Sequence, residues 1–390
     1  MLPQGIISVF KRELHSIISD KAYLAVVVLL PLLMILFFGV MFYRGTIEEL
    51  PIAVVDRDHS VMSRKLQSMI DATKGAKIAY QPHSMAEAEA LMLGGDVVAI
   101  LYIDDGFEED IYRGVSTMVE CYLLGTNLST SGVVERDVQQ TVETFSKGIA
   151  LSKLQSMGVG YSQAMADIMP ISIDTHIISN PYLNYGYYLA PIFMIMGMVI
   201  FTVLSSVYAI GRELRYATAR EWLQSARNSL LCGVIGKLLP ITLSMFLLSE
   251  LIYVILFVVM GMECEGSLLY LSVATLILIQ SYQAVAIAII SVTANMRLGL
   301  SLGGGYSVMA FTFSGITFPT IAMFGVARVV SKLFPLTYFS EIFVGQAMRG
   351  TPLYIETPKL LFMMLFWVLV PLSWRRLHRV VESEKYWGRE

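Results

Sequence analysis

Few residues of this chain have the types and spacing that chemistry requires. The run 56–59, Asp-Arg-Asp-His, resembles a metal-binding or acid–base cluster. It follows an expected strand and precedes an expected helix, however, where polar loop and capping residues are common. The five histidines lack the spacing of metal ligands, and neither H-E-x-x-H nor G-x-S-x-G occurs. The sequence therefore predicts no catalytic residues and no metal site.

Nucleotide chemistry is not expected either, because no G-x-x-x-x-G-K-[ST] phosphate loop is present. The glycines and lysine between Gly233 and Lys237 have the wrong spacing and lie against an apolar run.

One carboxylate does stand out. Glu250 lies well inside an apolar run, where a charge costs about 2.5–3.5 kcal/mol at the centre of a membrane helix. Gln280 and Gln283 in the next run could satisfy it, so a place on a transport pathway and a hydrogen-bonded packing role both stay open.

The composition explains why so few groups stand out. Of the 390 residues, 55% are hydrophobic and 15% are charged, whereas soluble globular chains have about 45–50% and about 25%. This excludes a disordered chain and argues against an ordinary soluble enzyme. The net charge of −3 gives no sign of the strongly basic face that nucleic acid binding requires.

The three cysteines fit neither a zinc site nor a disulfide framework. Single buried thiols are favoured, although Cys121 and Cys264 could form a disulfide if both lie on an oxidising side of the membrane.

Long apolar runs predict a membrane protein, because a helix needs about 20 apolar residues to cross a bilayer. Six runs are expected to be spans: Ala22–Tyr43, Tyr187–Ile210, Leu238–Met260, Leu268–Ala294, Leu298–Ala327 and Leu360–Trp374. The first is too long, and too closely flanked by charge, for a cleaved signal peptide. With the N-terminus inside, inner segments hold 14 Lys and Arg and the short outer segments hold four. The excess of positive charge predicts that both termini are cytoplasmic.

The two segments around the first run have distinct patterns. Ile6, Phe10, Leu14 and Ile18 recur every four residues, which is typical of a helix in the membrane interface; the frayed start of the first span is the alternative. Residues 44–186 hold 19 acidic and 10 basic residues and alternate strand-like with helix-like stretches, which predicts a small α/β sheet outside the membrane. The expected strands are Pro51–Asp56, Lys77–Gln81, Val97–Ile103, Met118–Leu124 and Ile171–Ile178, and the expected helices Ser60–Thr73, Met85–Leu93 and Leu128–Met157.

The segment 211–237 carries a resemblance to a known family. Permeases of ABC transporters of the type-2 membrane class have an R-E-x-x-x-x-T-x-x-x-L pattern here, followed by G-K-x-x-P at the start of the next span. The matching residues are Arg212, Glu213, Thr218, Trp222 and Leu223, then Gly236-Lys237-Leu-Leu-Pro240. Trp222 stands where Leu is common, and the usual Pro after the coupling segment is absent.

Two later motifs and the outer region fit the same family. The run 313–319, Phe-Ser-Gly-Ile-Thr-Phe-Pro, resembles its S-G-x-x-F-P element, and the run 334–339, Phe-Pro-Leu-Thr-Tyr-Phe, resembles its P-x-T-Y motif. PIAVVDRDHS and VVAILYIDDGF resemble the outer domain of export-type members with a large loop after the first span. Together the resemblance covers nearly the whole chain.

The resemblance implies an α-helical polytopic membrane protein with six transmembrane helices and an inserted α/β extracytoplasmic domain, located in a bacterial cytoplasmic membrane. Its parts would be an interfacial helix and first span (1–43), the extracytoplasmic domain (44–186), a five-helix region (187–374) and a cytoplasmic tail (375–390). The five-helix region would include a cytoplasmic coupling segment (211–237) and an outer re-entrant segment (319–350).

The implied function is that of a permease subunit of an ATP-driven exporter. The chain itself would be no enzyme and would hold no cofactor, because a separate ABC ATPase would bind ATP and Mg²⁺. Further implied partners are a second permease chain, identical or related, membrane lipid and a periplasmic adaptor. An amphipathic or lipid-like substrate is expected, since the apolar spans offer few polar groups. The alternative is a membrane-anchored extracytoplasmic binding or envelope-assembly protein without transport activity, which an ATPase that co-purifies with the chain would exclude.

Two groups of residues are the candidate sites. Coupling to the ATPase is expected at Arg212, Glu213, Thr218, Glu221, Trp222 and Leu223. Within this group Trp222 and Leu223 would be an apolar anchor ringed by polar residues, the usual form of an interface hot spot; a solvated linker is the alternative. The pathway is expected at Glu250, Gln280, Gln283, Phe318, Pro319, Pro335 and Tyr338, for which packing is the alternative role.

Overall fold

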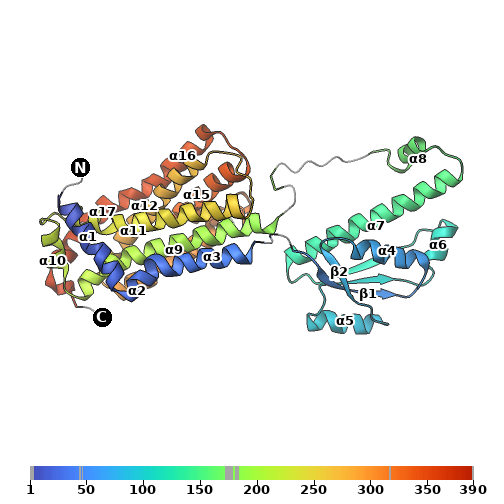
Figure 1. Ribbon diagram of the computed structural model, residues 1–390, viewed down its shortest axis with the longest axis horizontal. Helices are drawn as coiled ribbons and strands as arrows, with labels where there is room; N and C mark the ends of the chain where they lie inside the picture. The colour runs from blue at the N-terminus through green and yellow to red at the C-terminus, as the bar shows by residue number, and fades with distance from the viewer. Residues whose placement is uncertain are drawn as a thin grey trace. The chain divides into compact units, whose positions relative to one another are not determined.

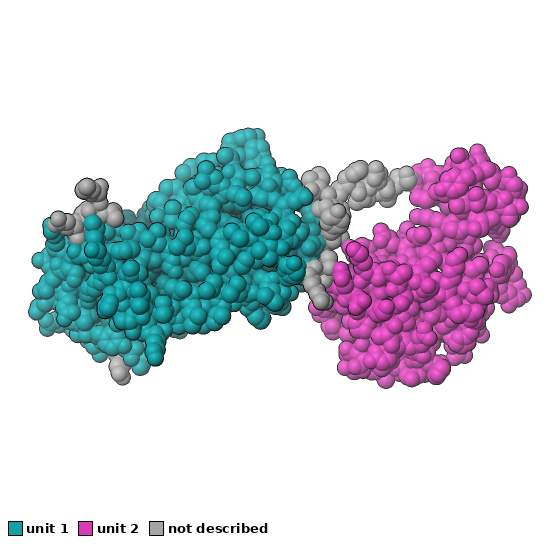
Figure 2. Space-filling view, viewed as in Figure 1, with its two compact units in different colours: residues 1–45, 177–390 teal, residues 46–176 magenta. Residues whose placement is uncertain are grey.

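The computed structural model describes residues 4–43, 45, 47–171, 179–180, 184–315 and 318–388. Contacts divide the chain into two compact units (Figure 2). Unit 1 comprises residues 1–45 and 177–390, and unit 2 comprises residues 46–176. Each unit has its own apolar core and is described separately.

Unit 1 is a bundle of helices (Figure 1). They are α1 (Gln4–Ser19), α2 (Lys21–Leu24), α3 (Leu30–Met41), α9 (Tyr185–Arg215), α10 (Ala219–Ser225), α11 (Leu230–Tyr253), α12 (Leu268–Thr293), α13 (Met296–Phe313), α14 (Gly325–Ser331), α15 (Pro335–Phe343), α16 (Leu353–Met364) and α17 (Leu369–Glu382). Within the described residues, five helical stretches are long and apolar enough to cross a membrane: Lys21–Met41, Tyr185–Arg215, Leu230–Val259, Leu268–Thr293 and Leu353–Glu382. Each overlaps one of the six predicted runs.

The remaining predicted run, Leu298–Ala327, is not one continuous helix. Its helix α13 ends at Phe313, and the chain then turns at Gly315, whose φ of +84° suits glycine. Along its length α13 lies against α9: a Cβ added at Gly303 would come within 2.7 Å of Val203, and the ring centroids of Phe311 and Phe193 are 5.8 Å apart. The number of six spans stays a prediction. The 18-residue helix α13 would be the additional span beside the five long apolar helices.

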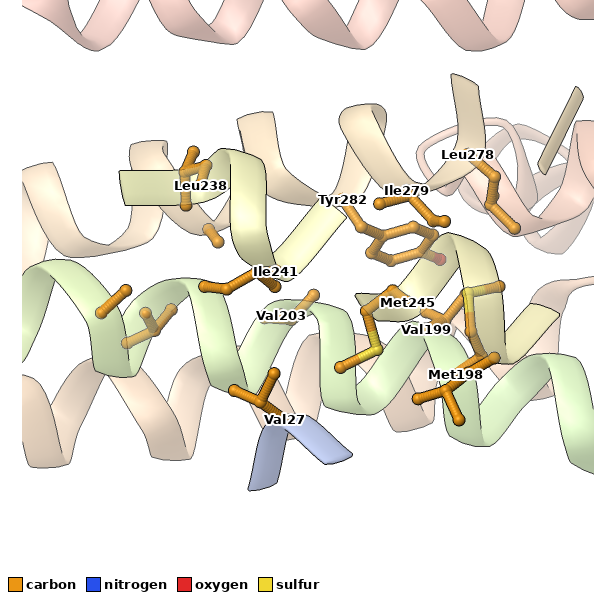
Figure 3. Close-up of a cluster of buried hydrophobic side chains, with 14 of the residues drawn as sticks. Val27, Met198, Val199, Val203, Leu238, Ile241, Met245, Leu278, Ile279 and Tyr282 are labelled. Carbon is orange, nitrogen blue, oxygen red and sulfur yellow. The ribbon is translucent and has the colours of Figure 1, made fainter. Parts of the chain in front are cut away.

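The core of unit 1 lies where α9, α11 and α12 meet (Figure 3). These helices are apolar on several sides, as expected of helices surrounded by other helices or lipid. The side chains drawn there include Met198, Val199, Val203, Ile241, Met245, Leu278, Ile279 and Tyr282. Val27, from the first span, reaches the same cluster. Side-chain packing therefore ties the first span to α9 and α11.

Unit 2 contains a four-stranded sheet of order β2-β1-β3-β4. The strands are β1 (Leu50–Asp56), β2 (Ala76–Tyr80), β3 (Ala99–Ile103) and β4 (Val119–Leu123); β1 is parallel to β2 and β3, and β4 is antiparallel to β3. The helices are α4 (Val61–Asp71), α5 (Met85–Gly94), α6 (Phe107–Arg113), α7 (Leu128–Ser156) and α8 (Tyr161–Ile168). Four of the five predicted strands overlap these strands, and the fifth, Ile171–Ile178, lies outside the described residues except for Ile171.

The alternation of side chains along β1 places helices on both faces of the sheet (Figure 1). Ile52 and Val54 face a core shared with α4 and α7, whereas Ala53 and Val55 face one shared with α5. The segments that leave β1 and β2 therefore run to opposite faces of the sheet.

Each of the three cysteines of the chain has a free thiol.

Candidate functional site

The segment between α9 and α11 contains α10, a short helix with a tight turn on either side. Ala217, after α9, has a φ of +57°, and Arg227 and Asn228, after α10, have φ values of +55° and +58°. Left-handed backbone at residues other than glycine is uncommon and costs free energy, so surrounding contacts must hold it. In Figure 1, α10 lies at the same end of the bundle as α1 and α17. The segment is therefore a bent, fixed connection rather than a loose linker.

Trp222 fixes α10 to the start of α11. Its side chain is 0% exposed, and its indole Nε1 donates a hydrogen bond to the Gly233 carbonyl at 3.3 Å. The ring also lies against Gly233, where an added Cβ would be 3.1 Å from Nε1. The expected role of Trp222 as an exposed anchor does not fit this position, because the side chain points into its own bundle. The exposed residues of α10 are polar, and they include Arg220, Glu221 and Gln224.

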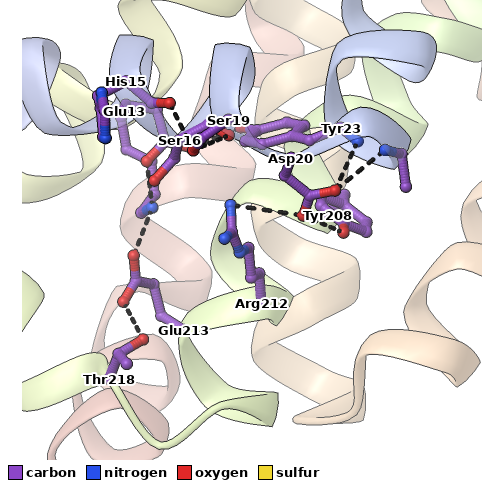
Figure 4. Close-up of polar contacts among 12 residues, drawn as sticks. Glu13, His15, Ser16, Ser19, Asp20, Tyr23, Tyr208, Arg212, Glu213 and Thr218 are labelled. Carbon is purple, nitrogen blue, oxygen red and sulfur yellow. Dashed lines mark hydrogen bonds and ion pairs between the residues drawn. The ribbon is translucent and has the colours of Figure 1, made fainter.

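A buried ion cluster lies directly beside Trp222. Figure 4 shows two of its members, Glu13 and Glu213. The ammonium of Lys237, on α11, is 2.5 Å from Glu13 Oε2 on α1 and 2.8 Å from Glu213 Oε1 on α9. Lys237 is 1% exposed and Glu13 is 2% exposed. The ammonium also lies 5.3 Å above the Trp222 ring, within the range of a cation–π interaction. One lysine thus joins three helices and contacts the side chain that holds α10.

The second oxygen of each carboxylate in this cluster is also hydrogen-bonded. Glu13 Oε1 accepts from the Tyr23 hydroxyl, and Glu213 Oε2 accepts from Arg12 at 3.0 Å and from the Thr218 hydroxyl. Buried charges are tolerated only where pairing and hydrogen bonds replace water. Since Thr218 is the residue before α10, its hydroxyl connects the cluster to the start of that helix. We call Arg12, Glu13, Glu213 and Lys237 the ion cluster.

Arg212 belongs to a neighbouring polar group around Asp20, the residue between α1 and α2 (Figure 4). The Asp20 carboxylate accepts hydrogen bonds from the backbone of Ala22 and Tyr23 and from the Tyr208 hydroxyl, and it lies 3.7 Å from Arg212. Burial alone would raise the pKa of Asp20, but these hydrogen bonds and the charge of Arg212 lower it below its ordinary value. Arg212 therefore contacts the N-terminal segment of its own chain.

The sequence pattern did not single out Arg12, Glu13 or the charge of Lys237 as functional. The sequence places Lys237 in the G-K-x-x-P motif just before the apolar run Leu238–Met260, yet it lies within α11. A signal was present: Ile6, Val9, Glu13 and Ile17 form the buried face of α1, so a carboxylate stands in an apolar stripe. Such a residue needs a buried cationic partner.

The intramembrane candidates do not form the group that the sequence suggested. Glu250 Oε1 is buried and, within the described part of the chain, has no hydrogen-bond partner. Gln283 instead accepts from the Thr242 hydroxyl at 3.0 Å and donates to the Leu238 carbonyl at 3.4 Å. Gln280 is half-buried on the same helix. Gln283 therefore ties α12 to α11 and does not satisfy Glu250.

The other pathway candidates lie near two cavities at the ends of α13 and α15. The first has a volume of about 410 Å³ and is lined mainly by apolar residues of α9, α15 and the segment after α13, including Pro319. The second, of about 360 Å³, includes Tyr338 and shares Thr320, Ile321 and Glu341 with the first. Phe318 is 54% exposed, and Pro335 is buried at the start of α15.

Close packing of α1 on α11 gives a test of the site. An added Cβ at Gly236 would lie 2.8 Å from the backbone oxygen of Ile6 and from Cβ of Val9. Gly236→Ala must therefore displace α1, and we expect it to lower the free energy of unfolding by about 1–3 kcal/mol. Reversible unfolding in mixed detergent micelles measures this change.

Gly304→Ala is the matched control for that measurement. Gly304 also lies within a helix, but nothing lies within 4 Å of an added Cβ. We expect alanine here to leave stability unchanged or to raise it by up to about 1 kcal/mol through helix propensity. Equal effects of the two substitutions would contradict the close packing of α1 against α11.

The chain matches the model of a known protein family. The model of the ABC-2 family transporter protein matches residues 21–373, which is nearly the whole chain. Comparisons with curated proteins and with solved structures gave no match. The matched region includes the five long apolar helices and the α10 segment. The chain therefore belongs to the ABC-2 transporter family and is a multi-pass membrane protein, the permease subunit of an ABC transporter.

Proposed function

We propose that the chain is the membrane subunit of an ATP-driven exporter and that a separate ABC ATPase docks on the exposed face of α10. That ATPase binds the ATP and Mg²⁺, and this chain binds no cofactor. The observation that carries the proposal is the attachment of α10. Trp222 and Thr218 connect it to the ion cluster, and the ion cluster joins α1, α9 and α11. A displacement of α10 is therefore passed to three helices at once.

The six residues expected to couple the ATPase divide into two kinds. Arg212, Glu213, Thr218 and Trp222 make contacts inside unit 1, so we assign them to the transmission of motion. Glu221 is exposed and Leu223 is half-buried, so these two remain candidates for direct contact with the ATPase. Arg220 is exposed and pairs with Glu384 at 3.4 Å; such surface pairs contribute about 0–1 kcal/mol and exchange readily.

The charge at this end of unit 1 supports a cytoplasmic position. Cations on or near α10 and in the second half of α17 include Arg212, Arg215, Arg220, Arg227, Arg375, Arg376 and Arg379. Basic residues beside span ends favour the cytoplasmic side. We therefore place α10 and both termini in the cytoplasm of a bacterium, with the chain in its cytoplasmic membrane and unit 2 on the outer side.

The substrate that we propose is amphipathic or lipid-like. The cavity of about 410 Å³ is lined mainly by apolar side chains, with Glu341 and Arg349 among the lining residues. An apolar hollow with a few charged groups suits a ligand that has an apolar body and a polar end. A second permease chain completes the transporter in this proposal, and a periplasmic adaptor is a further partner of unit 2.

Reversing two charges on α10 tests the docking face. Arg220 and Glu221 are exposed, so Arg220→Glu with Glu221→Lys should leave the fold intact. We expect the double variant to bind the ATPase at least about tenfold more weakly, because like charges then meet across the interface. Co-purification and the change in ATP hydrolysis caused by the permease in lipid vesicles measure this.

The matched control is Lys332→Glu, which reverses an exposed charge after α14. Binding of the ATPase should be unchanged in this variant. Unchanged binding in the α10 variant as well would remove the docking role of α10. An ATPase that neither binds nor responds to the wild-type chain would overturn the exporter and favour a membrane-anchored assembly protein.

A further inference from the structure

Unit 2 contains a crevice at the carboxyl ends of β1 and β2. The chain leaves β1 toward α4 on one face of the sheet and leaves β2 toward α5 on the other face (Figure 1). Such divergence opens a crevice at the carboxyl edge of parallel strands, where α/β proteins bind ligands. The crevice has a volume of about 610 Å³, within the range of small-molecule sites.

The lining of this crevice is rich in cationic and polar side chains. It consists of Val54, Asp56, Arg57, His59, Arg64, Gln67, Gln81, Pro82 and His83. Two guanidinium groups and two imidazoles thus line one hollow, in a region that holds 19 acidic and 10 basic residues. Within the described residues, neither Arg57 nor Arg64 forms an ion pair with a carboxylate.

The single carboxylate of the lining is already occupied by its own chain. Asp56 Oδ1 accepts from the backbone N–H groups of Asp58 and His59, and Oδ2 accepts from Ser63 and Gln67, both at 2.7 Å. Four donors therefore surround this carboxylate, and it holds the loop in place rather than neutralising the arginines. These hydrogen bonds within the loop explain the acid–base appearance of the run 56–59.

Arg64 is held at the crevice by a hydrogen bond from its guanidinium to the His59 carbonyl. That bond uses one of its five N–H groups, so the others are available to a ligand. Two arginines present planar donor groups that match phosphate oxygens in pairs. Imidazoles and the amides of Gln67 and Gln81 add donors for the rest of a ligand.

We propose that this crevice binds a phosphate group carried by a small molecule. Two guanidinium groups disfavour a metal cation here, and the volume admits a polar body as well as the phosphate. A free phosphate ester and the headgroup of a lipid offer the same chemistry. This site is separate from the exporter proposal, because it lies entirely within unit 2 and involves no residue of α10 or of the ion cluster.

Titration calorimetry on the purified full-length chain tests the free ester. The probes are inorganic phosphate and sn-glycerol 3-phosphate. We expect glycerol phosphate to bind, and Arg57→Gln and Arg64→Gln each to weaken binding at least about tenfold, since each removes charged hydrogen bonds. Both side chains are exposed, so the fold of unit 2 should survive, as circular dichroism checks.

Lys65→Gln is the matched control, because Lys65 is an exposed cation beside Arg64 that does not line the crevice. It should bind like the wild type. The lipid arm places the chain in nanodiscs of phosphatidylcholine with or without phosphatidic acid and follows thermal unfolding. Stabilisation by phosphatidic acid alone, lost in the two arginine variants, assigns the phosphate to a lipid. The proposal is overturned if neither soluble probe binds and phosphatidic acid gives no stabilisation that depends on the two arginines, or if Lys65→Gln weakens binding as much as the arginine variants do.

Discussion

Replacing Lys237 by methionine is expected to lower the free energy of unfolding by about 3–5 kcal/mol, because it leaves buried carboxylates without their shared cation. Lys237 is 2.5 Å from Glu13 and 2.8 Å from Glu213, and the cluster is closed to water. Methionine has a similar length, so the loss is electrostatic rather than one of volume. The same substitution should abolish the effect of the permease on ATP hydrolysis, since α1, α9 and α11 lose their common contact.

The control for this prediction removes the three most buried charges together and keeps the partly exposed Arg12. Glu13→Gln and Glu213→Gln, combined with Lys237→Met, should recover much of the lost stability, because replacing a buried ionic group as a unit is often neutral. Unfolding in mixed micelles compares the variants. A stability for Lys237→Met within about 1 kcal/mol of the wild type would contradict a buried, interdependent cluster.

Replacing Trp222 by alanine is the second large change, with an expected loss of about 3–5 kcal/mol, typical of a buried tryptophan. The side chain is 0% exposed, and it supplies the hydrogen bond to Gly233 and the ring below Lys237. Without it α10 has little to hold it against α11. We expect the ATPase to bind the variant but to lose the response of its hydrolysis rate to the permease.

Trp222→Phe separates packing from the hydrogen bond. Phenylalanine keeps an aromatic ring near Lys237 and loses the indole N–H, so we expect about 1–3 kcal/mol of destabilisation and partial coupling. Thermal unfolding and ATP hydrolysis in vesicles follow both variants. If Trp222→Ala instead abolished ATPase binding while stability stayed unchanged, Trp222 would be the exposed anchor that the sequence suggested.

The sequence predicted those elements whose signal is local. Apolar runs located five membrane-length helices, and the predicted strand Pro51–Asp56 overlaps β1. One predicted span was less accurate. The run Leu298–Ala327 has no charged residue, but its helix ends at Phe313 and the chain turns at Gly315. Composition alone does not show that turn.

The candidate site was only partly predictable because its contacts join distant parts of the chain. Glu13 and Lys237 are 224 positions apart, and Arg12 and Glu213 are 201 apart. No spacing rule connects such residues. Trp222 was located correctly within the α10 segment but assigned to the wrong surface, since a single aromatic residue on a short helix does not reveal which side is buried. Glu250 drew attention because it lies in an apolar run, and Lys237 did not because it lies at the edge of one.

The two left-handed turns beside α10 have a mechanical consequence. A flexible hinge would absorb a force by changing its backbone angles, but Ala217, Arg227 and Asn228 already occupy a narrow conformational well. Force applied to the polar face of α10 is therefore expected to act as a torque on the ends of α9 and α11. Because α1 is joined to both helices through Glu13 and Arg12, it should turn with them. The N-terminal helix is then a moving part of the transporter, and a bulky fusion before residue 4 should slow turnover more than one after residue 388.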